Sequence, residues 1–221
     1  MKKVLVTGAS GGLGLNLSKA LLERGYFVIM HYYKNIDGVL KLHERYPEQS
    51  IIIKCNLEDE LEVKKMNDDL SKYDISNIVI NQGIEHLSNL EEKNSKTFLD
   101  VFKVNTLASF LIFKYFGDNV NKNHGHIVVV SSDNTIDKYD MVTLEYDVSK
   151  YGLNMLSKEF ANYYLDSYIN TICFGFLDTP MNDFPDWVKD ELKFVPLQKA
   201  SDEIIKLLEC DYTGKEVVIN E

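Results

Sequence analysis

The chain has 221 residues, of which 45% are hydrophobic and 26% charged, and its formal net charge at pH 7 is −10. This is the composition of an ordinary globular protein and not of a disordered one, and the length predicts one domain over residues 1–221. The acidic balance provides no basic stripe for phosphate backbones, so we expect no nucleic-acid partner.

The N-terminus and the cysteines indicate a cytoplasmic protein. After Met1-Lys2-Lys3 only three apolar residues precede Thr7, which is too short a run for a signal peptide or a membrane span. We therefore expect no contact with a membrane. Cys55, Cys173 and Cys210 have no metal-ligand spacing, so we expect reduced thiols and no metal site.

The first predicted elements are a strand, a glycine-rich turn and a helix. Lys3 to Val6 is a short apolar run, the next eight residues contain four glycines, and leucines then recur at helical spacing up to Leu22. Glycines in such a turn let the backbone approach a pyrophosphate, and the helix N-terminus offers unpaired N–H groups. Because the turn joins the first strand to the first helix, dinucleotide binding is favoured over a purely structural turn.

The end of the second predicted strand bears on which dinucleotide binds. Gly25 ends the first helix, and residues 26–31 form a continuous apolar strand. Folds that bind NAD usually place an acid after this strand for the ribose 2′-hydroxyl, whereas a cation suits the 2′-phosphate of NADP. Here no acid occurs before Asp37, and Lys34 is the nearest cation. NADP is therefore favoured over NAD, although Lys34 also fits a solvated lysine.

The rest of the chain continues to alternate strands with helices. The pattern predicts a doubly wound, parallel, seven-stranded α/β sheet with helices on both faces, a Rossmann-like fold. The later helices are expected at 39–43, from 58 onward, at 95 to about 120, at 146–163 and at 201–208, the last capped by Ser201. Phe184, Trp187 and Phe194, within 182–199, suggest an apolar lid or simple packing. The remaining strands are expected at 51–55, 78–80, 126–130, 168–173 and 216–219.

Tyr146 and Lys150 are the candidate proton-transfer pair. On a helix over 146–163 they are spaced i and i+4, which places both side chains on one face about 5 to 6 Å apart at Cβ. An ammonium beside a phenol favours the phenolate, so we expect a lowered pKa for Tyr146. The spacing alone also fits two solvated side chains on a helix surface.

Polar and glycine residues recur where the predicted strands end. Ligands of open α/β sheets bind in the crevice beyond the carboxyl ends of the strands. Six consecutive strand ends carry such groups, which predicts one binding crevice. They are Gly8 to Gly14, Lys34, Asn56, Asn81 to Gly83, Ser132, and Gly175 to Thr179.

These motifs together resemble the short-chain dehydrogenase/reductase family, in its single-domain branch, over essentially the whole chain. Thr7-Gly8-x-x-x-Gly12-x-Gly14 is similar to the cofactor turn of that family, and Asn81-Gln82-Gly83 to its Asn-Ala-Gly turn, with Gln82 in place of alanine. Asn105, Ser132, Tyr146 and Lys150 match its catalytic tetrad in order and approximate spacing. Phe174-Gly175 stands in place of Pro-Gly, and Asp178 to Met181 resembles the segment that contacts the nicotinamide amide.

The resemblance implies an oxidoreductase that transfers a hydride between a nicotinamide dinucleotide and a carbonyl or secondary alcohol. Tyr146 would be the general acid or base, Ser132 would bind the substrate oxygen, and Lys150 would bind the nicotinamide ribose and lower the tyrosine pKa. Asn105 would hold a water in a proton relay. It implies cofactor contacts at Gly8, Ser10, Gly11, Gly12, Leu13, Gly14, Lys34, Asn56, Leu57, Asn81, Gln82, Gly83, Tyr146, Lys150, Gly175 and Thr179.

Several alternatives stay open at this point. Asn105 also fits a residue that satisfies backbone groups near the Asn81 turn, and Ser132 fits a cap. Gly11 and Tyr33 stand where members that prefer NADP often carry cations, which keeps NAD open. Other functions of this fold are a non-catalytic dinucleotide-binding sensor or partner subunit and a nucleotide-sugar epimerase or dehydratase, although the latter usually has a longer C-terminal region.

The substrate and the assembly are less constrained. The chain resembles 3-oxoacyl-thioester reductases most, but four acids between Asp133 and Glu145 argue against a strongly anionic substrate. A steroid, a sugar-derived ketone and an acyl thioester are not separated. The resemblance implies a homodimer packed through the helices that bear Asn105 and Tyr146. A tetramer is possible, but no glycine pair follows the last strand, as is common in the family.

Overall fold

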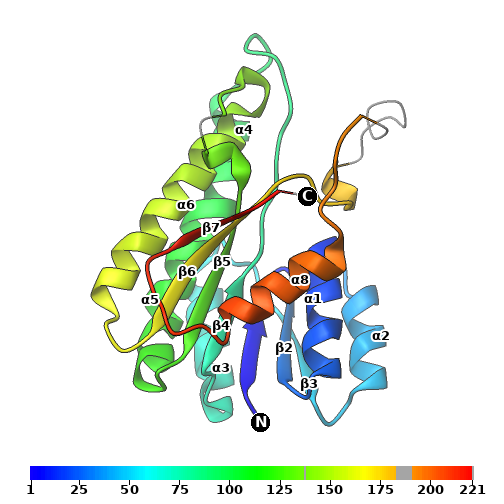
Figure 1. Cartoon of the computed structure of the whole chain (residues 1–221), viewed down its shortest axis with the longest axis vertical. Helices are drawn as coiled ribbons and strands as arrows, with labels where there is room; N and C mark the ends of the chain where they lie inside the picture. The colour runs from blue at the N-terminus through cyan, green and yellow to red at the C-terminus, as the bar shows by residue number, and fades with distance from the viewer. Residues whose placement is uncertain (137, 183–190, 221) are drawn as a thin grey trace.

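A seven-stranded parallel sheet forms the centre of the protein (Figure 1), as predicted. The computed structural model describes residues 1–136, 138–182 and 191–220. The strand order is β3-β2-β1-β4-β5-β6-β7, and every neighbouring pair runs parallel. The strands are β1 (Lys3–Val6), β2 (Phe27–Tyr32), β3 (Ser50–Lys54), β4 (Asn77–Ile80), β5 (His126–Ser132), β6 (Tyr168–Phe174) and β7 (Glu216–Ile219).

Helices cover both faces of the sheet. The helices are α1 (Gly12–Glu23), α2 (Asp37–Arg45), α3 (Glu60–Leu70), α4 (Ser95–Phe102), α5 (Ala108–Lys122), α6 (Leu144–Tyr163) and α8 (Leu197–Leu207). One apolar core lies between the sheet and α1, α2 and α8, and a second lies between the sheet and α3, α5 and α6 (Figure 1). The central strands are apolar on both sides because alternate residues face the two cores: Val28 and Met30 face the first and Ile29 the second.

Two helix predictions need correction. The helix expected from 95 to about 120 is interrupted by a π-helical turn, Lys103–Leu107. The extra residue in this turn directs Asn105 inward, where its side chain is fully buried. The last helix begins at Leu197, directly after Pro196, and not at Ser201. Ser201 is not a cap but a buried contact with α1, because its hydroxyl donates to Asn16 Oδ1 at 2.8 Å.

The sheet brings the predicted site segments to one edge. In a parallel sheet all carboxyl ends lie on the same side, and here the glycine turn, the Asn81 turn, Ser132 and Gly175 follow β1, β4, β5 and β6 there (Figure 1). Of the predicted lid, Phe184 and Trp187 lie outside the described residues. Phe194 lies 6.2 Å from Phe176 between ring centroids, so this part of the segment packs against the residues after β6.

Candidate active site at the carboxyl edge of the sheet

The glycine turn after β1 is closely packed. Gly8 has a φ of +60°, which favours glycine, and its carbonyl accepts a hydrogen bond from Gly11 N at 3.1 Å. A Cβ added to Gly14 would lie 2.3 Å from Gly8 O, so this glycine is required by contact. Helix α1 starts at Gly12 without a side-chain cap. Its first N–H groups can therefore bind an anion at the edge of the sheet.

Asn81 holds this turn in place from β4. Its Nδ2 donates to Thr7 O at 3.1 Å and to Gly8 O at 3.2 Å, and its backbone N donates to Thr7 Oγ1 at 2.9 Å. Asn81 was predicted to contact the cofactor. In the structure its amide contacts the turn that would hold the cofactor.

His31 is a second support of the turn, and sequence reasoning did not identify it. Gly8 N donates to His31 Nδ1 at 3.0 Å, and His31 Nε2 lies 2.9 Å from Cys55 O. The two bonds require a neutral ring with its proton on Nε2. Burial lowers the pKa of His31 to about 4, which keeps the ring neutral. The available sequence signal was a histidine at the end of an otherwise apolar strand.

Gln82, which replaces the usual alanine, links the glycine turn to the π-helical turn. Thr7 Oγ1 lies 2.5 Å from Gln82 Oε1, and Gln82 Nε2 donates to Ser109 Oγ at 2.9 Å. The Ser109 hydroxyl in turn donates to Asn105 O at 2.8 Å. All four residues are buried, so this polar network is satisfied inside the protein.

The Asn105 side chain binds backbone and serine groups beside the site. Its Oδ1 accepts from Ile84 N at 2.8 Å, and its Nδ2 donates to Ile84 O and to Ser149 Oγ, both at 2.9 Å. This is the structural role that the sequence left open. Asn105 nevertheless lies in the site, because a Cβ on Gly83 would be 3.5 Å from both Asn105 Oδ1 and Lys150 Nζ.

Tyr146 lies with Ser132 and Lys150, as their motif predicted. Lys150 Nζ is 5.5 Å from the centroid of the Tyr146 ring, and the Ser132 hydroxyl interacts with the phenol. The expected lowering of the Tyr146 pKa is wrong for the protein alone. Burial raises the pKa of Tyr146, with a further increase from the carboxylates of Glu85, Asp147 and Asp133, and only the Ser132 interaction opposes them.

Lys150 is itself buried, with 4% of the residue surface exposed. Its ammonium donates to Val130 O at 3.0 Å, and burial lowers its pKa to about 8. Desolvation therefore acts on both members of the pair and outweighs the attraction that their spacing predicts. The two side chains lie on one face of α6, as their spacing predicts, but their electrostatics differ from those expected.

The other predicted cofactor residues are distributed around the crevice. A Cβ on Gly12 would be 2.8 Å from Thr179 Cγ2, so Thr179 lies against the glycine turn. Gly175 lies next to Asp133, since a Cβ added to it would be 3.5 Å from Asp133 Oδ2. Asn56 Oδ1 accepts from Glu58 N at 3.2 Å after β3. Leu13 and Leu57 have buried side chains, Ser10 is half-buried and Lys34 is exposed.

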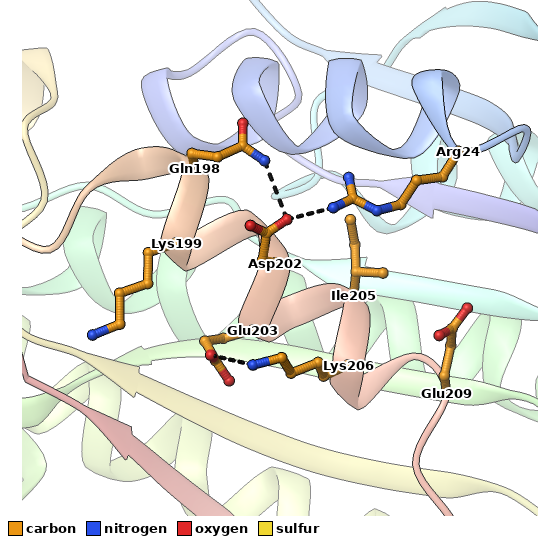
Figure 2. Close-up of a pocket in the computed structure, with 8 residues that line it drawn as sticks. All are labelled: Arg24, Gln198, Lys199, Asp202, Glu203, Ile205, Lys206 and Glu209. Atoms are coloured by element: carbon orange, nitrogen blue, oxygen red, sulfur yellow. Dashed lines mark hydrogen bonds and ion pairs between the residues drawn. The ribbon is translucent and has the colours of Figure 1, made fainter.

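A pocket away from this edge of the sheet lies elsewhere on the described part of the molecule. It has a volume of about 630 Å³ between α8 and the end of α1, and it contains none of the predicted site residues (Figure 2). Four of its charged side chains pair with one another: Arg24 with Asp202 at 2.6 Å and Lys206 with Glu203 at 2.6 Å. We assign it no role in the chemistry.

Neither a metal-binding cluster nor a membrane-spanning helix is found among the described residues. They contain no group of three or more histidine, cysteine or acidic side chains arranged to hold a metal ion. Over the same residues, no helix has the length and apolar character needed to cross a membrane. All three cysteines are free thiols, of which Cys55 and Cys173 are buried.

Comparison with known proteins identifies the family of the chain. The family model described as short chain dehydrogenase matches residues 2–187. The NADP-dependent mannitol dehydrogenase of Hypocrea jecorina is 27% identical over 214 residues, covering 91% of this chain and 80% of that protein. The 3-oxoacyl-acyl-carrier-protein reductase of Rickettsia conorii is 29% identical, covering 82% and 75%. The chain spans about half the length of two further curated relatives.

Solved structures show the same fold. An alcohol dehydrogenase from the archaeon Thermococcus sibiricus, complexed with 5-hydroxy-NADP, superposes with a TM-score of 0.88 at 22% identity. The superposition covers 99% of this chain and 96% of that structure. At this identity the likeness concerns the fold alone.

Proposed function

The chain belongs to the short-chain dehydrogenase family and is an oxidoreductase of CH–OH and C=O groups, and on that premise we propose that Tyr146 is its proton donor in NAD(P)H-dependent carbonyl reduction. One observation carries the proposal: the phenol of Tyr146, the Ser132 hydroxyl and the Lys150 ammonium lie together at the edge where the glycine turn opens. A pure dinucleotide-binding sensor, the main alternative, has no need of this cluster.

The residues of the crevice fit a nicotinamide dinucleotide. The close packing at Gly12 and Gly14 leaves backbone, and no side chain, at the N-terminus of α1, as a pyrophosphate requires. Gly8 to Gly14, Asn56, Asn81 to Gly83 and Thr179 would hold the cofactor, and Lys34 would contact a 2′-phosphate if NADP is preferred. When bound, the nicotinamide supplies or accepts the hydride.

The protein's own groups perform the proton transfer. Because the pKa of Tyr146 is raised, its phenol is protonated near neutral pH and can donate to a carbonyl oxygen. Ser132 donates a second hydrogen bond to that oxygen and stabilises the charge that develops on it. Lys150 orients the ribose and the phenol, and the raised pKa of Tyr146 keeps the phenol in the protonated form that carbonyl reduction requires near neutral pH.

The charges around Tyr146 indicate the class of substrate. Glu85 and Asp133 act on the phenol electrostatically, and both would repel an anionic group placed next to it. We therefore propose a neutral carbonyl compound. A polyol-derived ketone, which the mannitol dehydrogenase relative suggests, fits this charge pattern better than a strongly anionic thioester.

We also propose a cytoplasmic homodimer of single-domain chains. Exposed apolar side chains on α4, the π-helical turn, α5 and α6 support a dimer through these helices, as expected from the sequence. They include Leu99, Leu107, Phe110, Val148 and Met155. Size-exclusion chromatography with light scattering tests this assignment, and a chain that stays monomeric at micromolar concentration contradicts it.

The test of the proposed function combines cofactor binding with turnover. NADPH and NADH are titrated by fluorescence, and their oxidation is then followed with an aldehyde, a ketose, an aliphatic ketone and a 3-oxoacyl thioester. We expect binding below millimolar concentration, and turnover that Tyr146→Phe reduces by about 10²- to 10⁴-fold without loss of binding. Binding without turnover in the wild type favours the sensor. If neither cofactor binds, the proposed function fails.

A further inference from the structure

The residue before Tyr146 is a buried acid held by a buried lysine. Lys93 Nζ lies 2.5 Å from Glu145 Oε2, and the two side chains are 8% and 0% exposed. Of the ion pairs between described residues, only this one buries both side chains. The sequence motifs give Glu145 no role, yet it shares the first turn of α6 with Tyr146.

Lys93 also connects the loop after β4 to the turn that precedes α6. Its Nζ donates to Val142 O at 3.1 Å and lies 3.5 Å from Ser88 Oγ, and Ser88 N donates to the same Val142 carbonyl at 3.4 Å. Val142 lies in the 3₁₀ turn Met141–Thr143, directly before α6. The loop and the start of α6 are therefore joined at several points around one ammonium.

The other end of this loop is fixed by Asn105, which binds both the N–H and the C=O of Ile84. Asn105 Nδ2 also donates to Ser149 Oγ, whose hydroxyl donates to Tyr146 O at 2.7 Å. The backbone of Tyr146 is thus restrained from two directions. Ser149 holds its carbonyl, and Lys93 holds the adjacent Glu145.

The Lys93–Glu145 ion pair contributes more to the position of the first turn of α6 than to the stability of the fold. Taking two charges out of water costs much of what their attraction returns, so buried pairs are weak stabilisers. Glu145 Oε1 is also buried without a hydrogen-bond partner among the described residues. This oxygen therefore gains no hydrogen bond that would offset its burial. Burial alone would raise the pKa of Glu145, but Lys93 holds it below its ordinary value and keeps the carboxylate charged.

We propose that Glu145 and Lys93 are positioning residues, which fix the first turn of α6 so that the Tyr146 phenol stays aligned with Ser132. This inference rests on the proposed function, because it assumes that Tyr146 donates the proton. Neither residue needs to contact the substrate. Their effect is expected on the proton-transfer step and not on cofactor affinity.

The test compares Glu145→Gln with Glu60→Gln. Glu60 pairs with Lys114 at the same distance of 2.5 Å, but its side chain is 50% exposed, so it is a matched control for the loss of one carboxylate. Each variant is measured for NADPH affinity and stoichiometry and for kcat with the panel carbonyl that the wild type reduces fastest. The solvent isotope effect on kcat is measured as well. Hydrogen exchange of peptides covering 84–94 and 140–150 reports the local restraint.

For Glu145→Gln we expect a kcat lowered about tenfold, NADPH affinity within twofold of wild type, one cofactor per chain and a larger solvent isotope effect. Exchange should increase in the two peptides, and Glu60→Gln should leave all of these values unchanged. If Glu145→Gln does not fold, the double variant Lys93→Met, Glu145→Leu removes both charges and fills the space with apolar atoms. It should show the same kinetic changes.

Three outcomes overturn the inference. A wild-type kcat in Glu145→Gln or in the folded double variant overturns it and leaves the proposed function intact. A lower kcat with a proportional loss of cofactor stoichiometry and an unchanged isotope effect reduces the pair to a purely structural role. A wild-type chain that reduces no panel carbonyl overturns the proposed function and this inference with it.

Discussion

The glycine turn and the Tyr146–Lys150 pair lie at the same edge of the sheet, but their environments differ. In the turn, Gly8 N has His31 as its acceptor, and Gly8 O has Gly11 and Asn81 as donors. In the pair, Lys150 is buried and Tyr146 is half-buried, and Lys150 Nζ donates one hydrogen bond within the described residues, to Val130 O.

The difference separates what stabilises the fold from what the chemistry requires. The N–H and C=O of Gly8 are both satisfied within the protein, so the start of the turn does not depend on a ligand for its hydrogen bonds. A buried ammonium with one acceptor instead costs folding free energy, because an ammonium has three donors and loses its water on burial. We infer that the turn contributes to stability, whereas the pair is maintained at the expense of stability, as is common at active sites. The predictions below test this contrast.

The largest expected effect is that of Lys150→Met. We expect kcat to fall by about 10³-fold, because the ribose and the phenol lose their orienting group. Stability should change in the opposite direction. Burial lowers the pKa of Lys150 from 10.5 to about 8, so at pH 7 its charged form opposes folding by about 3 kcal/mol. The variant should be more stable than wild type by about 2 kcal/mol in urea unfolding at pH 7.

The lowered pKa of Lys150 also makes the stability of the protein depend on pH. Between pH 8 and 10.5 the unfolded chain binds more protons at Lys150 than the folded chain does, so wild-type stability gains from a rise in pH across this window. Lys150→Met should lack this gain. Lys158→Met is the control on the same helix, because Lys158 is 48% exposed. A destabilised Lys150→Met would contradict the contrast between the two regions.

Gly14→Ala tests whether the glycine turn contributes to stability. The added methyl would lie 2.3 Å from Gly8 O and 2.9 Å from Ala9 Cα, and neither backbone atom can move without opening the turn. We expect a loss of about 2 to 3 kcal/mol in the free energy of unfolding, together with loss of NADPH binding. Thermal unfolding and fluorescence titration measure the two effects.

Gly11→Ala is the matched control for that substitution. Its methyl would meet Gly8 O at 3.4 Å, an ordinary contact, and Gly11 has no positive φ. The unfolding temperature should therefore stay close to wild type. Equal losses in the two variants would show that the turn tolerates no side chain at all, and that the contact at Gly14 is not the cause.

The sequence predicted the fold, and the gathering of these segments at one edge of the sheet, because both depend on local patterns. Strands buried on both faces are continuously apolar, and in a parallel sheet their carboxyl ends meet at one edge, so the motifs after β1, β4, β5 and β6 had to gather there. The two wrong helix assignments have local causes as well. The π-helical turn depends on what Asn105 binds, and Ser201 resembles a cap only if Pro196 is overlooked.

The pKa shifts of Tyr146 and Lys150 and the contacts between residues distant in the chain could not be predicted from the sequence. The spacing of Tyr146 and Lys150 predicts attraction, but desolvation depends on the surrounding residues of α6, β5 and the loop after β4, which are distant in the chain. His31 and Gln82 act through partners such as Gly8 and Ser109, over sequence separations of 23 and 27 residues. A single sequence gives no sign of such pairs.

A smaller effect is expected from His31, which makes the free energy of unfolding depend on pH in the acid range. Its pKa is lowered to about 4 by burial, so the unfolded chain binds more protons than the folded chain between pH 6.5 and 4. Stability from the neutral ring is complete above pH 6.5 and is lost as the pH falls. From pH 8 to pH 5 the loss should be about 2 kcal/mol. In the folded chain the ring stays neutral until the pH approaches 4, so Gly8 N keeps its acceptor and NADPH affinity should hold from pH 8 to pH 5.

His31→Gln isolates this contribution, because a glutamine amide can accept from Gly8 N and donate to Cys55 O without titrating. Urea unfolding of both proteins at pH 8 and pH 5 gives the comparison. The wild type should lose more stability than the variant over this interval. Parallel losses would show that His31 does not titrate with the folding of the turn.

The smallest effect on cofactor binding is expected at Lys34, which follows β2 and would discriminate between NADPH and NADH. Lys34 is exposed, with its Nζ 5.7 Å from the Tyr33 ring centroid, so a contact with a 2′-phosphate would be screened by water. An exposed ionic contact is worth about 1 kcal/mol, so Lys34→Ala should weaken NADPH binding about fivefold and leave NADH binding unchanged.

The control is Lys64→Ala, which removes an exposed lysine on α3 and should alter the binding of neither cofactor. Because screening grows with salt, the NADPH difference should shrink between 50 and 500 mM NaCl, roughly over a threefold fall in Debye length. Equal losses for the two cofactors in Lys34→Ala would mean that the residue supports the turn and does not read the 2′-phosphate.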